Sequence, residues 1–192
     1  MPRSGVDIDR IVAVAVTIAD EKGIDGVTLK EISKRLGVSS PSLYNHVNGL
    51  SELKEELSLY ALELLKDYLI RAVIGRGGIL ALKEMGKAYI RFAREHTGLY
   101  ETIQWMNIAS DMRSSSMFSE VVQLVYDIAA DMGEDETVAS HIIRTVRSLA
   151  HGYACIESHG GFSHPSSVES SYAYAVDTFF AGLGARRELS VR

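Results

Sequence analysis

The residues best suited to chemistry lie between positions 39 and 46, where small polar, amide and aromatic side chains follow one another without an acid. They are Ser39, Ser40, Pro41, Ser42, Tyr44, Asn45 and His46. Hydroxyls, amides and ring edges can bond to phosphate oxygens and base edges, whereas carboxylates would repel phosphates. This composition favours recognition of double-stranded DNA.

A first helix must precede this segment and end in a tight turn. Thr28, with Glu31 three residues later, forms a capping-box pattern that predicts a helix start. Gly37 is expected to end this helix, because glycine readily takes the left-handed conformation that closes one. The residues expected on its buried face are Leu29, Ile32 and Leu36.

A second, short helix is expected to carry the polar residues themselves. Ser39 or Ser40 can cap it, and Pro41 fits its first turn because an N–H there would have no partner. Leu43 and Val47 then point inward. Together the two elements form a helix-turn-helix, whose second helix reads the major groove.

At these residues the chain resembles the TetR family of one-component bacterial transcription regulators. The matching residues are Thr28, then Gly37-Val38-Ser39, then Leu43-Tyr44 and His46-Val47. Residues 38–47 look most like the tetracycline-repressor type itself. One position departs from the pattern: the family usually has a phosphate-binding lysine at the start of the fourth helix, where this chain has Leu50, with Lys54 one turn further on.

We predict two kinds of DNA contact in this motif. The expected phosphate contacts are Thr28, Tyr44 and His46, with Lys30, Lys34 and Lys54 as weaker ones. The expected base readers are Ser40, Ser42 and Asn45, and Ser39 and Pro41 complete the surface. An asparagine amide is suited to adenine because it can form two hydrogen bonds with that base.

The charge distribution bears on how such a protein would bind DNA. The formal net charge is −5, but residues 1–50 hold six bases and six acids, so the excess of acid lies in the remainder. The N-terminal part is neutral. Affinity is then expected to rest on a few well-placed groups and on two copies per complex.

Composition predicts a helical protein of the cytoplasm. The 192 residues are 46% hydrophobic and include three prolines, so a sizeable core built from helices is expected. The single cysteine, Cys155, excludes an internal disulfide and fits a reducing compartment. No segment approaches ~18 uninterrupted apolar residues, and no signal peptide is evident, so we expect no membrane segment.

Apolar periodicity predicts an all-α fold of about nine helices. The expected ranges are 7–22, 28–36, a short helix from 39 or 40, 51–74, 79–95, 99–108, 118–132, 136–158 and one from about 167, with a frayed tail from Gly184. The seryl run 114–116 is expected to separate two helices, and Ser166 with Glu169 to cap the last. We assign residues 1–48 to DNA binding and residues 49–192 to effector binding and dimerisation.

The last two long helices are apolar over more of their circumference than one neighbour can cover. The residues concerned are Ile142, Ile143, Val146, Leu149, Ala150 and Tyr153 on one, and Tyr174, Val176 and Phe180 beside the stripe Val168, Tyr172, Ala175, Phe179 and Leu183 on the other. A homodimer joined by a four-helix bundle would cover them, as the family resemblance also implies; burial within one chain is the alternative. A dimer predicts an inverted-repeat operator.

The C-terminal part also resembles a sensor class of TetR-like regulators. Residues 147–162 resemble the His-Gly segment of the WHG-type C-terminal domain, and residues 96–100 resemble its His-Pro-Gly-Leu-Tyr turn. This resemblance implies release from DNA by a small-molecule effector. An aromatic and methionine set suits a flat or greasy ligand; its members are Tyr89, Phe92, Trp105, Met106, Met112, Phe118, Tyr126, His151 and Cys155.

Other chemistries have weaker support. His141, His151, His159 and His164 lack the i, i+3 or i, i+4 spacing of helical metal ligands, and no phosphate loop, dinucleotide fingerprint or nucleophile elbow appears. We therefore expect no metal, no cofactor and no enzymatic activity. The alternatives are a ligand-binding protein or enzyme that keeps the helix-turn-helix only as scaffold, and activation instead of repression.

Overall fold

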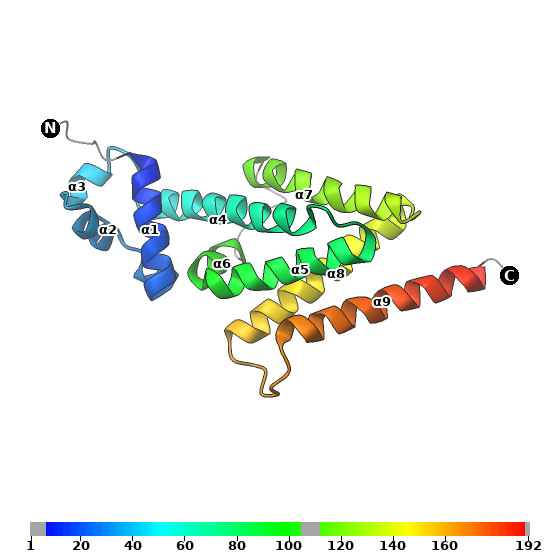
Figure 1. Cartoon of the computed structure of the whole chain (residues 1–192). Helices are drawn as coiled ribbons and strands as arrows, with labels where there is room; N and C mark the ends of the chain where they lie inside the picture. Colours follow the sequence, from blue (N-terminus) through cyan, green and yellow to red (C-terminus); the bar gives the residue numbers. More distant parts are fainter. Residues whose placement is uncertain (1–6, 105–111, 191–192) are drawn as a thin grey trace. The chain divides into compact units, whose positions relative to one another are not determined.

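The computed structural model describes residues 7–104 and 112–190, without the side chains of residues 104, 112–115 and 186–190. The described residues form nine α-helices and one 3₁₀ helix, as expected for an all-α chain (Figure 1). The helices are α1 (Ile8–Lys22), η1 (Ile24–Gly26), α2 (Leu29–Leu36), α3 (Ser40–Leu43), α4 (Leu50–Val73), α5 (Gly78–Glu95), α6 (Thr97–Gln104), α7 (Met112–Asp131), α8 (Glu136–Ser158) and α9 (Val168–Ser190).

The chain packs as two compact units. Unit 1 comprises residues 1–64 and 95–115, and unit 2 comprises residues 65–94 and 116–192. Helix α4 contributes residues to both units. This division by packing differs from the predicted division by function between residues 48 and 49, which stays a prediction.

Unit 1 is built on α1. The Asp7 carboxylate caps this helix by accepting a hydrogen bond of 2.8 Å from the Arg10 amide. The apolar stripe of α1 is buried: Ile11, Val12, Ala15, Ile18 and Ala19. Ile32 of α2 and Leu43 of α3 are fully buried, whereas Leu29 and Leu36, also predicted to be buried, are only half-buried. The core that holds the helix-turn-helix therefore lies between these three helices.

The turn between α2 and α3 follows from local sequence. The Thr28 hydroxyl accepts a hydrogen bond of 3.1 Å from the Glu31 amide, so the predicted cap is present. Gly37 has φ 68° and ψ 30°, the left-handed conformation that glycine adopts without steric cost. The Val38 amide then donates to the Ser33 carbonyl at 3.0 Å, which closes the helix end.

Helix α6 packs against α1 within unit 1. Leu99 and Tyr100 are fully buried, and the His96 Nδ1 atom lies 3.2 Å from Asp20 Oδ2. The predicted range for this helix was residues 99–108. The described helix begins earlier, at Thr97, and residues 105–108 lie outside the described residues.

Unit 2 joins α5, α8 and α9. Phe92 of α5, Ile142 of α8 and Val176 of α9 are each fully buried, and α8 and α9 lie side by side (Figure 1). Lys83 on α5 forms an ion pair of 2.9 Å with Asp177 on α9. These three helices share the core of the unit with α4 and α7, which contribute the buried residues Leu65 and Ala129.

Three predicted features of α7 and α9 differ from the structure. Residues 114–116 lie inside α7, which begins at Met112, because serine costs a helix only a few tenths of a kcal/mol relative to alanine. The Ser167 hydroxyl caps α9, accepting a bond of 3.1 Å from the Ser170 amide, while Ser166 bonds to His164 instead. The tail from Gly184 is helical through Ser190.

The buried stripe of α9 also differs from the predicted one. It repeats every four residues: Val168, Tyr172, Val176 and Phe180 are buried. Ala175, Phe179 and Leu183 are only half-buried. Among residues 7–104 and 112–190, no helix combines the length and the apolar character that crossing a membrane requires.

Candidate functional site

The predicted reading surface consists of α3 and the turns that follow it. Helix α3 ends at Leu43, but hydrogen bonds continue: the His46 and Val47 amides donate to the Leu43 carbonyl at 2.9 and 3.1 Å. Leu43 and Val47 are buried and anchor the segment, whereas Tyr44 is 59% exposed and its neighbours Asn45 and His46 are exposed too. The structure therefore presents three predicted contact residues together on one exposed turn.

The remaining residues of this surface are smaller. Ser39 and Pro41 are exposed, and Ser40 and Ser42 are half-buried. Ser39 is the N-cap residue of α3, although its side chain makes no capping bond. The Ser39 carbonyl accepts two hydrogen bonds from Ser42, one from its Oγ at 2.6 Å and one from its amide at 3.0 Å.

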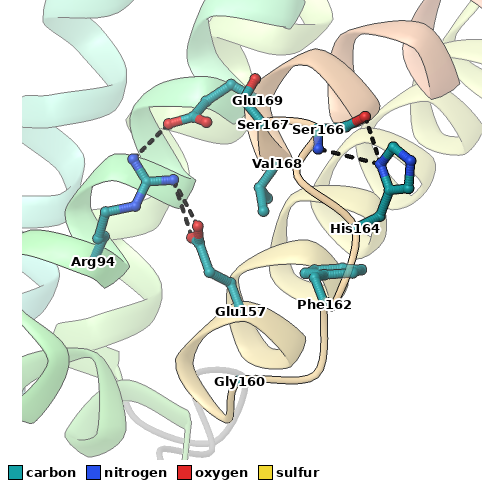
Figure 2. A pocket seen from close by; sticks show the side chains of 9 residues that line it. All are labelled: Arg94, Glu157, Gly160, Phe162, His164, Ser166, Ser167, Val168 and Glu169. Atoms are coloured by element: carbon teal, nitrogen blue, oxygen red, sulfur yellow. Dashed lines mark hydrogen bonds and ion pairs between the residues drawn. The ribbon is translucent and has the colours of Figure 1, made fainter.

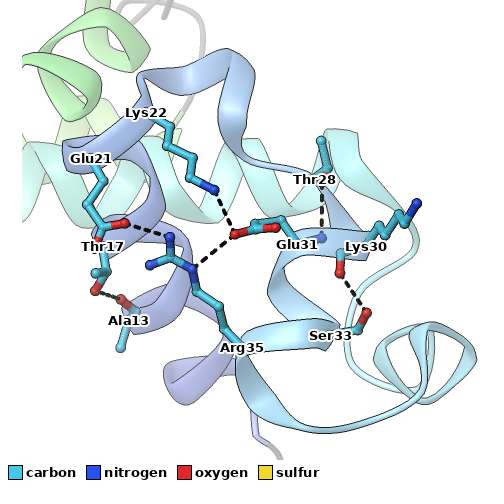
Figure 3. A network of polar contacts seen from close by, with 9 residues as sticks. All are labelled: Ala13, Thr17, Glu21, Lys22, Thr28, Lys30, Glu31, Ser33 and Arg35. Carbon is cyan, nitrogen blue, oxygen red and sulfur yellow. Dashed lines mark hydrogen bonds and ion pairs between the residues drawn. The ribbon is translucent and has the colours of Figure 1, made fainter.

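An ion-pair network ties α1 to α2 (Figure 3). Glu31 pairs with Lys22 at 2.8 Å and with Arg35 at 3.3 Å, and Arg35 also pairs with Glu21 at 2.6 Å. Because both carboxylates accept hydrogen bonds from cations, the pKa of Glu31, bonded to Lys22 and Arg35, and that of Glu21, bonded to Arg35, lie below their ordinary value. Two bases, Lys22 of α1 and Arg35 of α2, are thus neutralised within the protein.

Two lysines on α2 remain available for contact with phosphates. Lys30 and Lys34 are exposed, and neither forms an ion pair with a carboxylate of the described residues. Thr28 is exposed as well, and its hydroxyl proton stays available for a phosphate because the oxygen serves as the acceptor of the cap. All three of these predicted phosphate contacts are therefore exposed to solvent.

The start of α4 differs from the expected phosphate site. Where a lysine is usual, Leu50 begins the helix, and the Glu52 carboxylate accepts a hydrogen bond of 2.5 Å from the Asn48 amide. This carboxylate occupies a backbone donor and places negative charge in the first turn. Lys54, one turn on, is half-buried. Lys54 is therefore the first cation that α4 could offer to a phosphate.

Of the predicted effector-binding residues, two are brought together in unit 2. The Tyr89 hydroxyl on α5 lies 3.2 Å from His151 Nδ1 on α8. The pKa of His151 is lowered, chiefly by burial and then by the nearby Arg147 cation, so the imidazole is neutral at neutral pH. The structure thus places a phenol beside a neutral imidazole in unit 2.

The other predicted effector-binding residues are not brought together in this way. Phe92 is fully buried, with its ring 5.5 Å from that of Tyr68, so it serves the core. Phe118, Tyr126 and Cys155 are half-buried. Trp105 and Met106 lie outside the described residues, as does the side chain of Met112.

A surface pocket of about 410 Å³ lies in unit 2 where α8 leads into α9 (Figure 2). The Arg94 guanidinium lies at its wall, donating to Glu169 at 2.6 Å and to Glu157 at 2.8 Å. This bonding raises the pKa of Arg94 and, chiefly through Arg94, lowers that of Glu169. Sequence reasoning missed this cluster because its members are far apart in the chain.

Comparison with known proteins agrees with this architecture. The family model for "Bacterial regulatory proteins, tetR family" matches residues 11–49, and that for "Tetracyclin repressor-like, C-terminal domain" matches residues 82–179. The uncharacterized HTH-type transcriptional regulator YobS of Bacillus subtilis (strain 168) is 34% identical over 183 residues, which is 95% of either chain.

Solved structures share the fold. A Rhodococcus sp. RHA1 protein of unknown function has a TM-score of 0.79 at 21% identity, over 95% of this chain and 98% of that one. A TetR variant from Acinetobacter baumannii AYE, in complex with minocycline, has a TM-score of 0.67 at 16% identity, over 95% and 99%. Since both family models describe regulators, an enzyme that uses the motif as scaffold is not favoured. This chain belongs to the TetR family and is a DNA-binding transcriptional regulator.

Proposed function

We propose that the protein represses transcription by binding an inverted-repeat operator as a homodimer, and that a small-molecule effector releases it. The observation that carries this proposal is the exposed, acid-free surface of residues 39–46, anchored from beneath by Leu43 and Val47. Residues 1–48 would bind DNA in the cytoplasm, and residues 49–192 would bind the effector and dimerise.

Apolar groups left exposed on α8 and α9 support the homodimer. Tyr174 is 74% exposed and Ile156 is 46% exposed, and Ile143, Phe179 and Leu183 are half-buried. Exposed apolar groups along two adjacent helices are typical of a self-complementary interface. A dimer with two reading turns requires two half-sites, which predicts the inverted repeat.

A neutral pair in unit 2 supports effector binding. Tyr89 and His151 place two polar side chains without net charge side by side, which suits an uncharged or aromatic small molecule. A similarly folded TetR variant from Acinetobacter baumannii AYE has been solved in complex with the small molecule minocycline. To empty the operator, the effector must favour the DNA-free state by several kcal/mol.

The proposal is tested by titrating the purified protein into duplex DNA from upstream of its own gene and into a randomised pool, at two salt concentrations. We expect saturable binding that protects an inverted repeat. Tyr44→Ala should weaken it by about 5- to 100-fold, because each half-site loses one hydrogen bond. Tyr60→Ala is the matched control, since Tyr60 is 43% exposed on α4, outside the proposed surface. Absence of binding to either DNA would refute DNA-mediated repression.

A further inference from the structure

Three groups in the helix-turn-helix form a hydrogen-bond relay with a definite direction. Ser33 Oγ donates to the Lys30 carbonyl at 2.9 Å, as Figure 3 shows, and it also lies 2.9 Å from Ser40 Oγ. A hydroxyl carries one proton. Both bonds can therefore form together only if Ser40 donates to Ser33 and Ser33 donates to Lys30.

The direction of this relay decides what Ser40 can offer to DNA. Because its proton is held by Ser33, Ser40 keeps only acceptor lone pairs for an outside partner. Ser42 is in the same state, because its proton is donated to the Ser39 carbonyl at 2.6 Å. The two half-buried serines of α3 are thus both restricted to accepting hydrogen bonds.

An acceptor on the protein needs a donor on the base. In the major groove the donors are the amino groups of adenine N6 and cytosine N4, whereas guanine and thymine present acceptors. The commonest guanine contact uses an arginine or lysine, and the sequence has neither between Arg35 and Lys54. The segment that carries α3 therefore lacks the side chains that favour guanine.

We infer that Ser40 and Ser42 read the amino groups of adenine or cytosine, and that Ser33 is a positioning residue that enforces this choice at Ser40. This inference rests on the proposed function and adds a base preference to it. Ser33 is only 5% exposed, so it acts through Ser40 and does not touch DNA itself. Replacing it changes which bases Ser40 accepts without removing a DNA contact.

Alanine substitutions separate the roles of the two serines. Ser40→Ala removes the reader, so discrimination should be lost at one operator position. Ser33→Ala keeps Ser40 but frees the proton of the Ser40 hydroxyl. That hydroxyl can then donate, so guanine or thymine should be tolerated at the same operator position. The matched control is Ser58→Ala: Ser58 is 7% exposed, and its hydroxyl donates to the Lys54 carbonyl at 2.8 Å, away from α3.

The test is selection from a randomised duplex pool with the wild type and these three variants, followed by titration of single duplexes. The wild type should prefer adenine or cytosine at the affected position by about 3- to 10-fold. Where that base is adenine, replacement by purine, which lacks the 6-amino group, should remove the preference. Ser58→Ala should select the wild-type sequence.

The outcomes are distinguishable. A guanine or thymine preference at the Ser40-dependent position, or an unchanged preference in Ser40→Ala, overturns the inference while leaving DNA binding intact. An unchanged preference in Ser33→Ala alone overturns the positioning role of Ser33. Failure of the wild type to enrich any sequence overturns the proposed function together with it. If Ser33→Ala melts below the assay temperature, the Ser40→Ala and purine results still decide whether Ser40 reads an amino group.

Discussion

The hydroxyl of Tyr172, in α9, lies directly against Gly86, in the middle of α5, so that a Cβ at position 86 would overlap it. The tyrosine side chain is fully buried, and its ring packs edge-on against Tyr153 of α8 at 6.1 Å. Three helices of unit 2 thus meet at one residue. Glycine is a poor helix former, and its place in α5 is explained by the room that this ring needs.

Gly86→Ala should destabilise the protein by about 1–3 kcal/mol, because the added methyl group forces the ring of Tyr172 or helix α5 to shift. Thermal unfolding measures the change. Gly152→Ala is the matched control: Gly152 lies in α8 with open space around its Cα, so alanine there should stabilise by about 0.5–1 kcal/mol. Equal melting temperatures for wild type and Gly86→Ala would show that the contact is loose.

Tyr172→Phe should leave the free energy of unfolding unchanged or raise it, by about 1–3 kcal/mol at most. The Tyr172 hydroxyl is buried and has no hydrogen-bond partner among the described residues. Folding therefore removes the hydrogen bonds of this hydroxyl to water without replacing them. Burial accordingly raises the pKa of this phenol. Chemical denaturation with urea gives the free energy of unfolding. A marked loss of stability would reveal a partner for the hydroxyl.

Arg94→Met should cost about 0.5–1 kcal/mol at neutral pH, since the Arg94 side chain is 45% exposed and its ion pairs are screened. The effect should depend on pH. Arg94 lowers the pKa of Glu169 from its ordinary 4.5 in the folded state, so the stabilisation is present above that value and is lost as the pH falls through the lowered pKa.

The measurement is the free energy of unfolding of wild type and Arg94→Met from pH 7 to pH 3. The two curves should converge towards the acid end. Arg71→Met serves as control, because Arg71 is 79% exposed and its pair with Asp67 is 3.7 Å long. A constant difference between wild type and Arg94→Met across this range would exclude the ion pairs as its cause.

Glu31→Gln should strengthen nonspecific DNA binding and steepen its salt dependence. The substitution removes the carboxylate that Lys22 and Arg35 share, so their positive charge is less compensated within unit 1. Each additional phosphate contact adds about 0.9 to the slope of log affinity against log salt. Titration of random-sequence duplex at several salt concentrations measures that slope.

Glu55→Gln is the control for net charge, because Glu55 is exposed on α4 and forms no ion pair with the described residues. If both glutamine variants gain affinity equally, the gain comes from net charge alone. A gain confined to Glu31→Gln shows that the network withholds these particular cations from DNA.

The sequence alone determined the helices whose ends are set by neighbours in the chain. Thr28 and Gly37 bound α2 as expected, and α8 occupies the predicted residues 136–158, capped by Asp135. Caps and turns are bonds between residues three to five positions apart, so a local pattern contains both partners. The absence of acids from residues 39–46 is likewise a local property, so the sequence contains it without reference to the fold.

Packing between helices sets which of these side chains have spare hydrogen-bonding capacity and which faces of the helices are buried. Ser33 and Ser40 belong to different helices, and Arg94 meets Glu157 and Glu169 from 63 and 75 residues away. Likewise, α9 buries Val176, not Ala175. Such partners are set by how helices pack against one another, and a pattern confined to one helix does not contain them.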